Sequence, residues 1–288
     1  MNTVGILSPG DMGHTVGQRL REHGLRVIAY LSDRSERTRQ LAAKAGIEEV
    51  SSYEALVKEA DIVLSILVPA QAGAAAQAVA EALNKTGAEL LFADCNAIAP
   101  QTTCRIGKVV EDAGGRFVDA SIIGPPPRRE GTTRFYASGT HAEQLARLNE
   151  YGLDVPVVSA RIGDASAVKM CYAGLTKGLT ALCTELLVAA EALGVRRALL
   201  EEYRTSQAAM LQRMEGGLPG MPPKSRRWVG EMEEIAATMD SVGLTPKFHE
   251  AAADMYRFVG GSSLADRTPE DPEEPTLEEM LQVLVDNL

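Results

Sequence analysis

The chain has few of the residues that mark secreted, metal-binding or nucleic-acid-binding proteins. Its four cysteines form no C-x-x-C pair and show no metal spacing, so we expect free thiols in a reducing cytosol. Its four histidines are scattered, which argues against a zinc site, and no metal is expected. The net charge of −10 and the pI near 5.0 argue against nucleic acid or an anionic membrane as the main partner.

The sequence also shows no long apolar segment of the kind that forms a secretory leader or a membrane span. The chain opens directly into a short apolar run, so we expect no secretory leader. No stretch approaches the length that spans a bilayer, so we expect no membrane segment and a cytoplasmic protein. A length of 288 residues predicts roughly two domains.

The chain begins with a strand, a glycine turn and a helix, an order that suits dinucleotide binding. Such a turn collects backbone N–H groups and the positive end of a helix dipole beside a pyrophosphate. The usual G-x-G-x-x-G pattern has Ser8 in place of its first glycine. A plain strand–turn–helix without a ligand is the alternative, and we expect the Asp11 carboxylate to point away from the phosphates. The predicted cofactor-binding residues of the turn are Ser8, Gly10, Asp11, Met12 and Gly13.

Strands and helices alternate over about the first 155 residues, which predicts a doubly wound, mostly parallel sheet. After the first strand, we expect strands near 26–30, 49–50, 62–67, 89–93, 117–120, 135–137 and 155–158. Capping boxes are predicted to begin at Ser51 and Thr140. Pro69 is expected to end the fourth strand, and Pro100 to lie in the first turn of a helix.

From about residue 159 the pattern becomes helical. Helices are predicted over 164–193, 197–214, 225–242, 246–259 and 276–285, with Thr245 capping the fourth and a capping box beginning at Thr276. Loops are expected over 216–223 and 269–275. The sequence therefore predicts an α/β protein, with a Rossmann-type doubly wound domain over residues 1–160 followed by an all-α domain over 161–288.

The loop after the second strand favours NADP over NAD. An acidic residue at the strand end would bind the adenosine ribose and repel a 2′-phosphate, but Asp33 lies about two residues too late for that role. A guanidinium offers forked donors to a phosphate. We therefore predict that Ser32, Arg34 and Ser35 bind the 2′-phosphate, with help from Arg37. A solvated loop that caps a helix is the alternative.

Ligands of such sheets bind beyond the carboxyl ends of the strands. In this chain those ends fall at residues 67–70, 94–97 and 121–124. Leu67 and Val68 are predicted to contact the cofactor. Asn96 has two interpretations of equal weight: it binds the nicotinamide ribose or the substrate, or it stabilises a turn.

The long helix carries the candidate catalytic residue, Lys169. It follows the sheet domain by one helical turn, so its ammonium would point back at the crevice. A lysine in an apolar site can exchange a proton with an alcohol or ketone oxygen, although spacing alone favours a solvated lysine. Gly174 and Gly178 each cost the helix about 1 kcal/mol relative to alanine, so we expect a close neighbour, a backbone or a ligand, beside them.

Four segments carry a family resemblance: Gly10-x-Met12-Gly13 and residues 94–96, 119–124 and 163–169. Together they resemble the β-hydroxyacid dehydrogenase superfamily, which includes 3-hydroxyisobutyrate and 6-phosphogluconate dehydrogenases. The resemblance implies that Lys169 is the catalytic acid and base, and that the C-terminal helices form a homodimer. Residues 226–236 look like a poorly characterised subgroup with its own helical C-terminal domain.

Two departures from the superfamily concern the substrate. Ala173 stands where the family has an asparagine, and residues 123–125 replace a Ser-Gly-Gly that holds a carboxylate with Ile-Gly-Pro. We expect the chemistry to be kept and the substrate to differ, with Arg128, Arg129 or Arg227 as candidates for the lost anion contacts. The predicted substrate-binding residues are Ser121, Ile123, Gly124, Tyr172, Trp228 and Met232. For Trp228 and Met232, core packing is the favoured alternative.

Two classes of function are therefore open. The first is an NADP-dependent oxidoreductase of a hydroxy or keto small molecule, in which Lys169 moves the hydroxyl proton while Asn96 and Ser121 orient the reacting groups. The retained lysine favours this chemistry over that of the related imine reductases, in which the lysine position is generally changed. The second is a sensor or scaffold that binds NADP without turnover.

Overall fold

A computed structural model of the chain describes residues 1–268, 271 and 274–288, so part of the loop expected over 269–275 lies outside the described residues. The chain divides into two compact units, Met1–Met170 and Cys171–Leu288, which we call unit 1 and unit 2. This boundary falls later than the one expected from the sequence, inside a long helix whose first turn packs within unit 1. The four cysteines, all among the described residues, are free thiols as expected.

Unit 1 contains one sheet of eight strands in the order β3-β2-β1-β4-β5-β6-β7-β8. The strands are β1 (Thr3–Leu7), β2 (Arg26–Tyr30), β3 (Glu48–Val50), β4 (Ile62–Ser65), β5 (Leu91–Asp94), β6 (Arg116–Ile123), β7 (Arg134–Ser138) and β8 (Val157–Ser159). Only the pairing of β6 with β7 is antiparallel within this sheet, so the predicted mostly parallel, doubly wound sheet is confirmed. The strand order reverses between β1 and β4, which is where such folds bind ligands.

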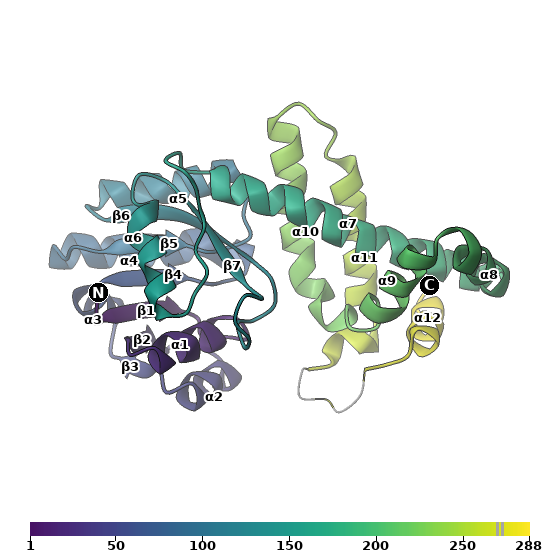
Figure 1. The fold of residues 1–288 in the computed structure, drawn as a ribbon, viewed down its shortest axis with the longest axis horizontal. Helices are drawn as coiled ribbons and strands as arrows, with labels where there is room; N and C mark the ends of the chain where they lie inside the picture. Colours follow the sequence, from purple (N-terminus) through teal and green to yellow (C-terminus); the bar gives the residue numbers. More distant parts are fainter. Residues whose placement is uncertain (269–270, 272–273) are drawn as a thin grey trace. The chain divides into compact units, whose positions relative to one another are not determined.

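Helices cover both faces of this sheet, and each face has its own apolar core between the sheet and its helices (Figure 1). One face carries α1 (Gly13–Glu22), α2 (Glu36–Lys44) and α6 (Ala142–Ala146), and the other carries α3 (Tyr53–Glu59), α4 (Pro69–Thr86) and α5 (Pro100–Asp112). Because side chains alternate along a strand, Leu64 and Val63 of β4 enter opposite cores. The continuous apolar run of β4 is therefore buried on both faces, as predicted.

Three helix starts in unit 1 differ from the sequence prediction. Pro69 does not end the fourth strand but opens α4. Proline is tolerated there because the first N–H groups of a helix have no acceptor within the helix. The cap of α3 is Ser52 and not Ser51. The two adjacent serines carry the same hydroxyl group, so the sequence alone does not distinguish them. The capping box predicted from Thr140 is wrong, since α6 begins at Ala142 without a side-chain cap.

The described elements of unit 2 are helices. They are most of α7 (Asp164–Ala192), which begins in unit 1, and α8 (Arg196–Ser206), α9 (Ala208–Gly217), α10 (Ser225–Ser241), α11 (Lys247–Gly260) and α12 (Leu277–Val285), together with two short 3-10 helices, Pro222–Lys224 and Ser263–Asp266. Helices α10 and α11 lie side by side (Figure 1). The single helix predicted over 197–214 is two helices, because the chain breaks at Gln207. The capping box of Thr276 and Glu279 is confirmed at the start of α12.

Helix α7 is long and apolar enough to cross a membrane by length and composition, with a mean hydropathy of 1.3 in its most apolar window. The expectation that no stretch reaches this length is therefore wrong. A long core helix of a soluble protein passes the same test, and 44% of that window is buried inside the structure. The helix also carries Lys177, which pairs with Glu231 inside unit 2, so core packing accounts for its composition.

Candidate functional site

The turn between β1 and α1 leaves room for a phosphate group. Apart from its chain neighbours, no described heavy atom lies within 4 Å of a Cβ built on Gly10. A Cβ on Gly13 would lie 2.8 Å from the Ser8 carbonyl oxygen, so the helix start touches the turn. The first N–H groups of a helix have no acceptor within it. The residues present therefore fit the pyrophosphate of a dinucleotide.

Ser8 adopts the backbone conformation that the missing glycine would adopt. Its φ is +60°, and it is the one non-glycine residue with positive φ in the described chain. Gly10 N–H donates to its carbonyl oxygen at 2.8 Å and closes the turn. The left-handed conformation costs an L-residue roughly 1–2 kcal/mol, so the turn keeps its shape at a cost in stability.

The Asp11 carboxylate is paired with a cation. Its Oδ1 accepts a hydrogen bond from Arg37 Nη2 at 2.6 Å, which offsets the negative charge beside the turn. In the structure Arg37 therefore pairs with Asp11. The sequence alone suggests instead that Arg37 helps to bind the 2′-phosphate. Nothing in the spacing of the arginines distinguishes these two roles.

The loop between β2 and α2 is ordered by an arginine that the sequence analysis did not single out. Arg39 Nη2 donates to the Ser32 carbonyl oxygen at 2.7 Å, and its Nε donates to the Arg34 carbonyl oxygen at 3.1 Å. Ser35 Oγ accepts from Thr38 N–H at 3.3 Å and caps α2. The capping interpretation of this loop is thus correct for Ser35, while Arg39 fixes the backbone that carries Arg34.

Four neighbouring strands carry a row of polar side chains in lateral register on one face of the sheet. The row consists of Ser65, Asp94, Asp119 and Ser138. All four are buried. Burial, with a contribution from the charge of Asp119, raises the pKa of Asp94 to about 7. Burial also raises the pKa of Asp119, although hydrogen bonds from Ser166 and Ser138 act in the opposite direction.

Asn96 uses its side chain to join the ends of β4 and β5. Its Oδ1 accepts from Leu67 N–H at 2.5 Å, and its Nδ2 donates to Ser65 Oγ at 3.0 Å. The residue is buried. These contacts match the turn-stabilising interpretation, and they fix the backbone of Leu67, while Val68 next to it is exposed.

Lys169 lies at the carboxyl end of β6. Its Nζ donates to the Ile122 carbonyl oxygen at 2.6 Å, so the ammonium reaches the strand end, as its position one turn into the helix predicts. Ser121 is fully buried, and its Oγ has no partner among the described residues. Ile123 is also buried, and a Cβ on Gly124 would collide with the Thr132 carbonyl oxygen. Gly124 is therefore required by the backbone, whether or not it contacts a substrate.

Two of the three arginines proposed to bind an anion, Arg128 and Arg129, belong to unit 1. Arg128 lines a cleft of unit 1 with His14 and Lys44, and Arg129 lines a second cleft of that unit with Asp154. Arg227 belongs to unit 2. Within unit 1, Arg128 and Arg129 therefore line separate clefts and do not form one anion site.

The candidate substrate residues of unit 2 are Tyr172, Trp228 and Met232. Tyr172 is exposed, and Met232 is fully buried, as core packing predicts. Trp228 packs edge-on against Tyr256, with 5.3 Å between ring centroids, and Lys177 Nζ lies 5.1 Å from the Trp228 ring centroid. Burial lowers the pKa of Lys177, while its partner Glu231 acts in the opposite direction. Trp228 is therefore part of a packed cluster inside unit 2.

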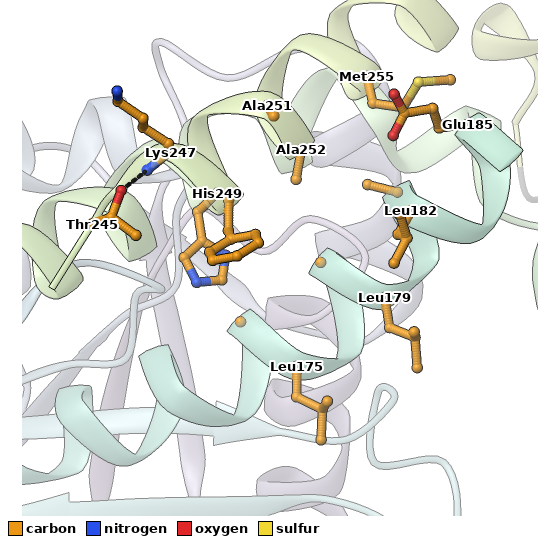
Figure 2. Close-up of a pocket in the computed structure, with 14 residues that line it drawn as sticks. Leu175, Leu179, Leu182, Glu185, Thr245, Lys247, His249, Ala251, Ala252 and Met255 are labelled. Atoms are coloured by element: carbon orange, nitrogen blue, oxygen red, sulfur yellow. Dashed lines mark hydrogen bonds between the residues drawn. The ribbon is translucent and has the colours of Figure 1, made fainter.

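A groove of about 620 Å³ lies in unit 2 between α7 and α11 (Figure 2). Leu175, Leu179 and Leu182 of α7 line it, with Thr245 Oγ1 accepting from Lys247 N–H near the start of α11. A Cβ on Gly174 would lie 3.2 Å from Cε1 of His249, and one on Gly178 would lie 3.7 Å from His249 Nδ1. The close neighbour of both glycines in the structure is thus the ring of His249, a side chain and not a backbone.

Comparison with protein families divides the chain at a similar place. Residues 3–151 match the NAD binding domain of 6-phosphogluconate dehydrogenase. Residues 190–259 match a domain of unknown function, DUF1932. The first match covers the glycine turn and strands β1 to β7 of unit 1, and the second lies wholly in unit 2.

Two curated relatives show how far the similarity extends. An uncharacterised 28.5 kDa protein of Methanothermus fervidus is 27% identical over 257 residues, which cover 89% of this chain and 98% of that protein. The mitochondrial 3-hydroxyisobutyrate dehydrogenase of Bos taurus is 28% identical over 173 residues, which cover 58% of this chain and 51% of the dehydrogenase. The match therefore spans about half the length of the dehydrogenase.

Three solved structures have a similar fold. A conserved protein of unknown function, described as structurally similar to 3-hydroxyacid dehydrogenases, is 30% identical, with a TM-score of 0.66 and coverage of 89% of this chain and 97% of that one. A 3-hydroxyisobutyrate dehydrogenase of Mycobacterium tuberculosis with L-serine has a TM-score of 0.72 at 20% identity, covering 99% of both chains. An imine reductase of Streptomyces aurantiacus has a TM-score of 0.57 at 16% identity, covering 98% of this chain and 99% of that one. The last two likenesses show the fold alone.

Proposed function

The chain belongs to the family that carries the NAD binding domain of 6-phosphogluconate dehydrogenase, and from this premise we propose that it is an NADP-dependent oxidoreductase of a hydroxy or keto small molecule. The observation that carries the proposal is the hydrogen bond from Lys169 Nζ to the Ile122 carbonyl oxygen. It holds a proton-carrying group at the carboxyl edge of the sheet, where folds of this kind bind their ligands. The 3-hydroxyisobutyrate dehydrogenases among its relatives support the reaction class.

The cofactor would be held by backbone and side chains of unit 1. The open side of Gly10 and the start of α1 suit the pyrophosphate. Arg34 and Ser32 suit the 2′-phosphate, and Arg39 fixes the loop that carries them. When bound, the nicotinamide supplies hydride acceptance or donation.

Lys169 moves the proton that accompanies this transfer. In the oxidative direction its amine takes the proton of the substrate hydroxyl, and in the reductive direction it returns that proton to the carbonyl oxygen. The Ile122 carbonyl accepts a hydrogen bond from Nζ and so limits the positions that the side chain adopts. Asn96 contributes by holding β4 and β5 together, which keeps the strand ends in place.

The test of this proposal separates cofactor binding from turnover. NADPH at about 100-fold excess over its Kd should stabilise the folded protein by roughly 2.7 kcal/mol in thermal melting. Lys169→Ala should keep that shift and lose at least about 100-fold in the NADP-linked oxidation of 3-hydroxyisobutyrate or L-serine, since general acid–base groups contribute 10²–10⁴. Full activity in the variant would reject proton transfer by Lys169, and the absence of a shift with either nucleotide would reject cofactor binding.

The preference for NADP has its own matched pair of variants. Arg34→Ala should weaken NADPH binding about tenfold or more and spare NADH, because a charge-assisted hydrogen bond is lost only with the phosphorylated cofactor. Arg37→Ala should weaken both cofactors alike, because it frees the Asp11 charge beside the shared pyrophosphate. Equal effects of Arg34→Ala on both cofactors would reject the phosphate contact.

A sensor that binds NADP without turnover is the second candidate, and the strained backbone of Ser8 is the observation that favours it. It predicts a melting shift with NADPH and no turnover of any ketone, hydroxy acid or imine. Imine reduction that persists in Lys169→Ala would instead indicate an imine reductase, whose fold this chain shares.

We further propose a cytoplasmic homodimer formed through the helices of unit 2. The groove between α7 and α11 is apolar, and Leu175 and Phe248 at its lining are 67% and 79% exposed. A second copy would remove these side chains from water. Phe248→Glu should therefore yield monomers in light scattering, whereas Val158→Glu, at an exposed valine of unit 1, should not. A monomeric wild type would reject the dimer.

A further inference from the structure

The first turn of α7 is bound by a carboxylate from a strand of the sheet. Asp119 Oδ2 accepts from the backbone N–H groups of Gly163 at 2.9 Å and Ser166 at 3.1 Å, and Oδ1 accepts from Ser166 Oγ at 2.7 Å. Ser138 Oγ donates to the same carboxylate at 2.8 Å and accepts from Ala165 N–H at 3.0 Å. Helix-start amides have no acceptor within their own helix, so β6 and β7 supply acceptors that α7 lacks.

Strand β6 and helix α7 make a second contact, three residues after Asp119 on the strand and three residues after Ser166 on the helix. Lys169 follows Ser166 by almost one helical turn, and Ile122 follows Asp119 along β6. At this second point Lys169 Nζ donates to the Ile122 carbonyl oxygen at 2.6 Å. Three residues advance a strand by about 10 Å and a helix by about 4.5 Å, so only a long side chain spans the second contact.

The first contact therefore determines whether the second is possible. Asp119 is fully buried, and its two oxygens accept four hydrogen bonds, three of them from the start of α7. A negative charge at the amino end of a helix also interacts favourably with the helix dipole. Without this carboxylate, the amides of the first turn would be buried with no acceptor, and the turn that carries Lys169 would be released from the sheet.

We propose that Asp119 is the positioning residue of Lys169: it fixes the first turn of α7 on β6 and so holds Nζ at the Ile122 carbonyl. The catalytic consequence of this contact rests on the proposed function. The structural claim concerns unit 1 alone and holds for any role of the lysine.

Competitive labelling of lysines with acetic anhydride, read by mass spectrometry, tests the claim without a substrate. In Asp119→Ala, Lys169 should label about tenfold faster or more, because a hydrogen bond to a charged group is worth at least that factor. The buried Lys177 and the exposed Lys108 should keep their wild-type rates. An unchanged rate at Lys169, or equal increases at Lys169 and Lys177, would overturn the proposal, since the second result means a general loosening.

A matched control is available in the same network. Thr103 Oγ1 lies 2.8 Å from Ser166 Oγ, yet no hydrogen bond joins it to the Asp119 carboxylate among the described contacts. Thr103→Val should therefore lose some stability and leave the labelling of Lys169 unchanged. If Asp119→Ala does not fold, Asp119→Asn keeps the size of the side chain while removing its charge, and Lys169 must still label faster than in the wild type for the proposal to stand.

Activity provides a separate readout. With 3-hydroxyisobutyrate as the probe, Asp119→Ala should lower kcat about 10–100-fold, because small misplacements of a reacting group have effects of that size. The NADPH-induced melting shift should stay at its wild-type value, since the glycine turn is untouched. If the wild type turns over no probe, the proposed function fails, while the labelling result still decides the position of Lys169.

Discussion

Asp94→Asn should abolish a pH dependence of stability that a single buried carboxyl group creates. Asp94 ends β5 with its Oδ1 accepting from Asn96 N–H at 3.0 Å, while its Oδ2 has no partner among the described residues. Burial, together with the neighbouring charge of Asp119, raises its pKa from 3.8 to about 7. In this environment the carboxyl group holds a proton up to nearly neutral pH, whereas in the unfolded chain it ionises near pH 4.

The sign follows from the number of protons bound. Between about pH 4 and pH 7 the folded state holds one more proton at this site than the unfolded state, so the free energy of unfolding falls as pH rises. The slope is about 1.4 kcal/mol per pH unit, and the full interval of about three units corresponds to roughly 4 kcal/mol. Asparagine does not titrate, and its buried amide adds only an offset that does not vary with pH.

The measurement is urea unfolding at pH 5, 6, 7 and 8, followed by far-ultraviolet circular dichroism because the single tryptophan lies in unit 2. From pH 5 to pH 7 the stability of Asp94→Asn relative to wild type should rise by about 2.3 kcal/mol, and from pH 7 to pH 8 by only about 0.3 kcal/mol more, because the slope falls as the pH passes the folded-state pKa. Asp61→Asn is the control, since hydrogen bonds from Asn2 and Thr3 outweigh burial and lower the pKa of Asp61. Its difference from wild type should be constant over this range. A constant difference for Asp94→Asn as well would show that the buried carboxyl is ionised, and the reasoning would fail.

Other substitutions test the backbone and the helix packing. Ser8→Gly should stabilise the protein by about 0.5–1 kcal/mol in thermal melting, because relief of the left-handed strain exceeds the entropy that glycine adds to the unfolded chain, whereas Ser8→Ala should not stabilise it. Gly178→Ala should gain about 1 kcal/mol of helix propensity, and Gly174→Ala should gain less or lose stability, because its Cβ meets His249 at 3.2 Å; equal effects would refute the packing explanation. Burial lowers the pKa of His249, so the unfolded chain takes up a proton first and stability should fall as pH drops below 6.5; His249→Phe should melt with less acid sensitivity over that range.

The fold of unit 1 could be predicted because its signals are local. Strands such as β1, β4 and β5 are short apolar runs, and the helices between the strands begin and end near proline, serine or glycine signals in the sequence. The prediction failed where two local choices are equivalent, as with the adjacent serines 51 and 52. In unit 2 it also missed the break at Gln207 between α8 and α9, for which the structure offers no packing explanation, since α8 has no buried residue. Sequence reasoning found the helices and strands more reliably than their ends.

The site was predicted less completely, because many of its contacts join distant segments or use the backbone. The position of Lys169 could be expected, but its partner is a carbonyl oxygen of Ile122, which carries no side-chain signal. Arg34, Arg37 and Arg39 look alike in the sequence, although Arg37 binds the Asp11 carboxylate and Arg39 binds loop carbonyls. Which arginine reaches which partner depends on the direction of α2, and spacing does not encode that.

The two buried aspartates show most clearly what the sequence lacks. Asp94 and Asp119 lie opposite each other on β5 and β6 with the same burial, and each follows a buried apolar residue. They differ because the start of α7, more than forty residues further along the chain, delivers its donors to Asp119 alone. Asp119 therefore fixes a helix, whereas Asp94 keeps an oxygen without a partner and titrates near neutral pH. Equivalent positions in one sheet thus acquire different chemistry from the element that packs against them, and the pH slope of one and the lysine labelling of the other measure that difference directly.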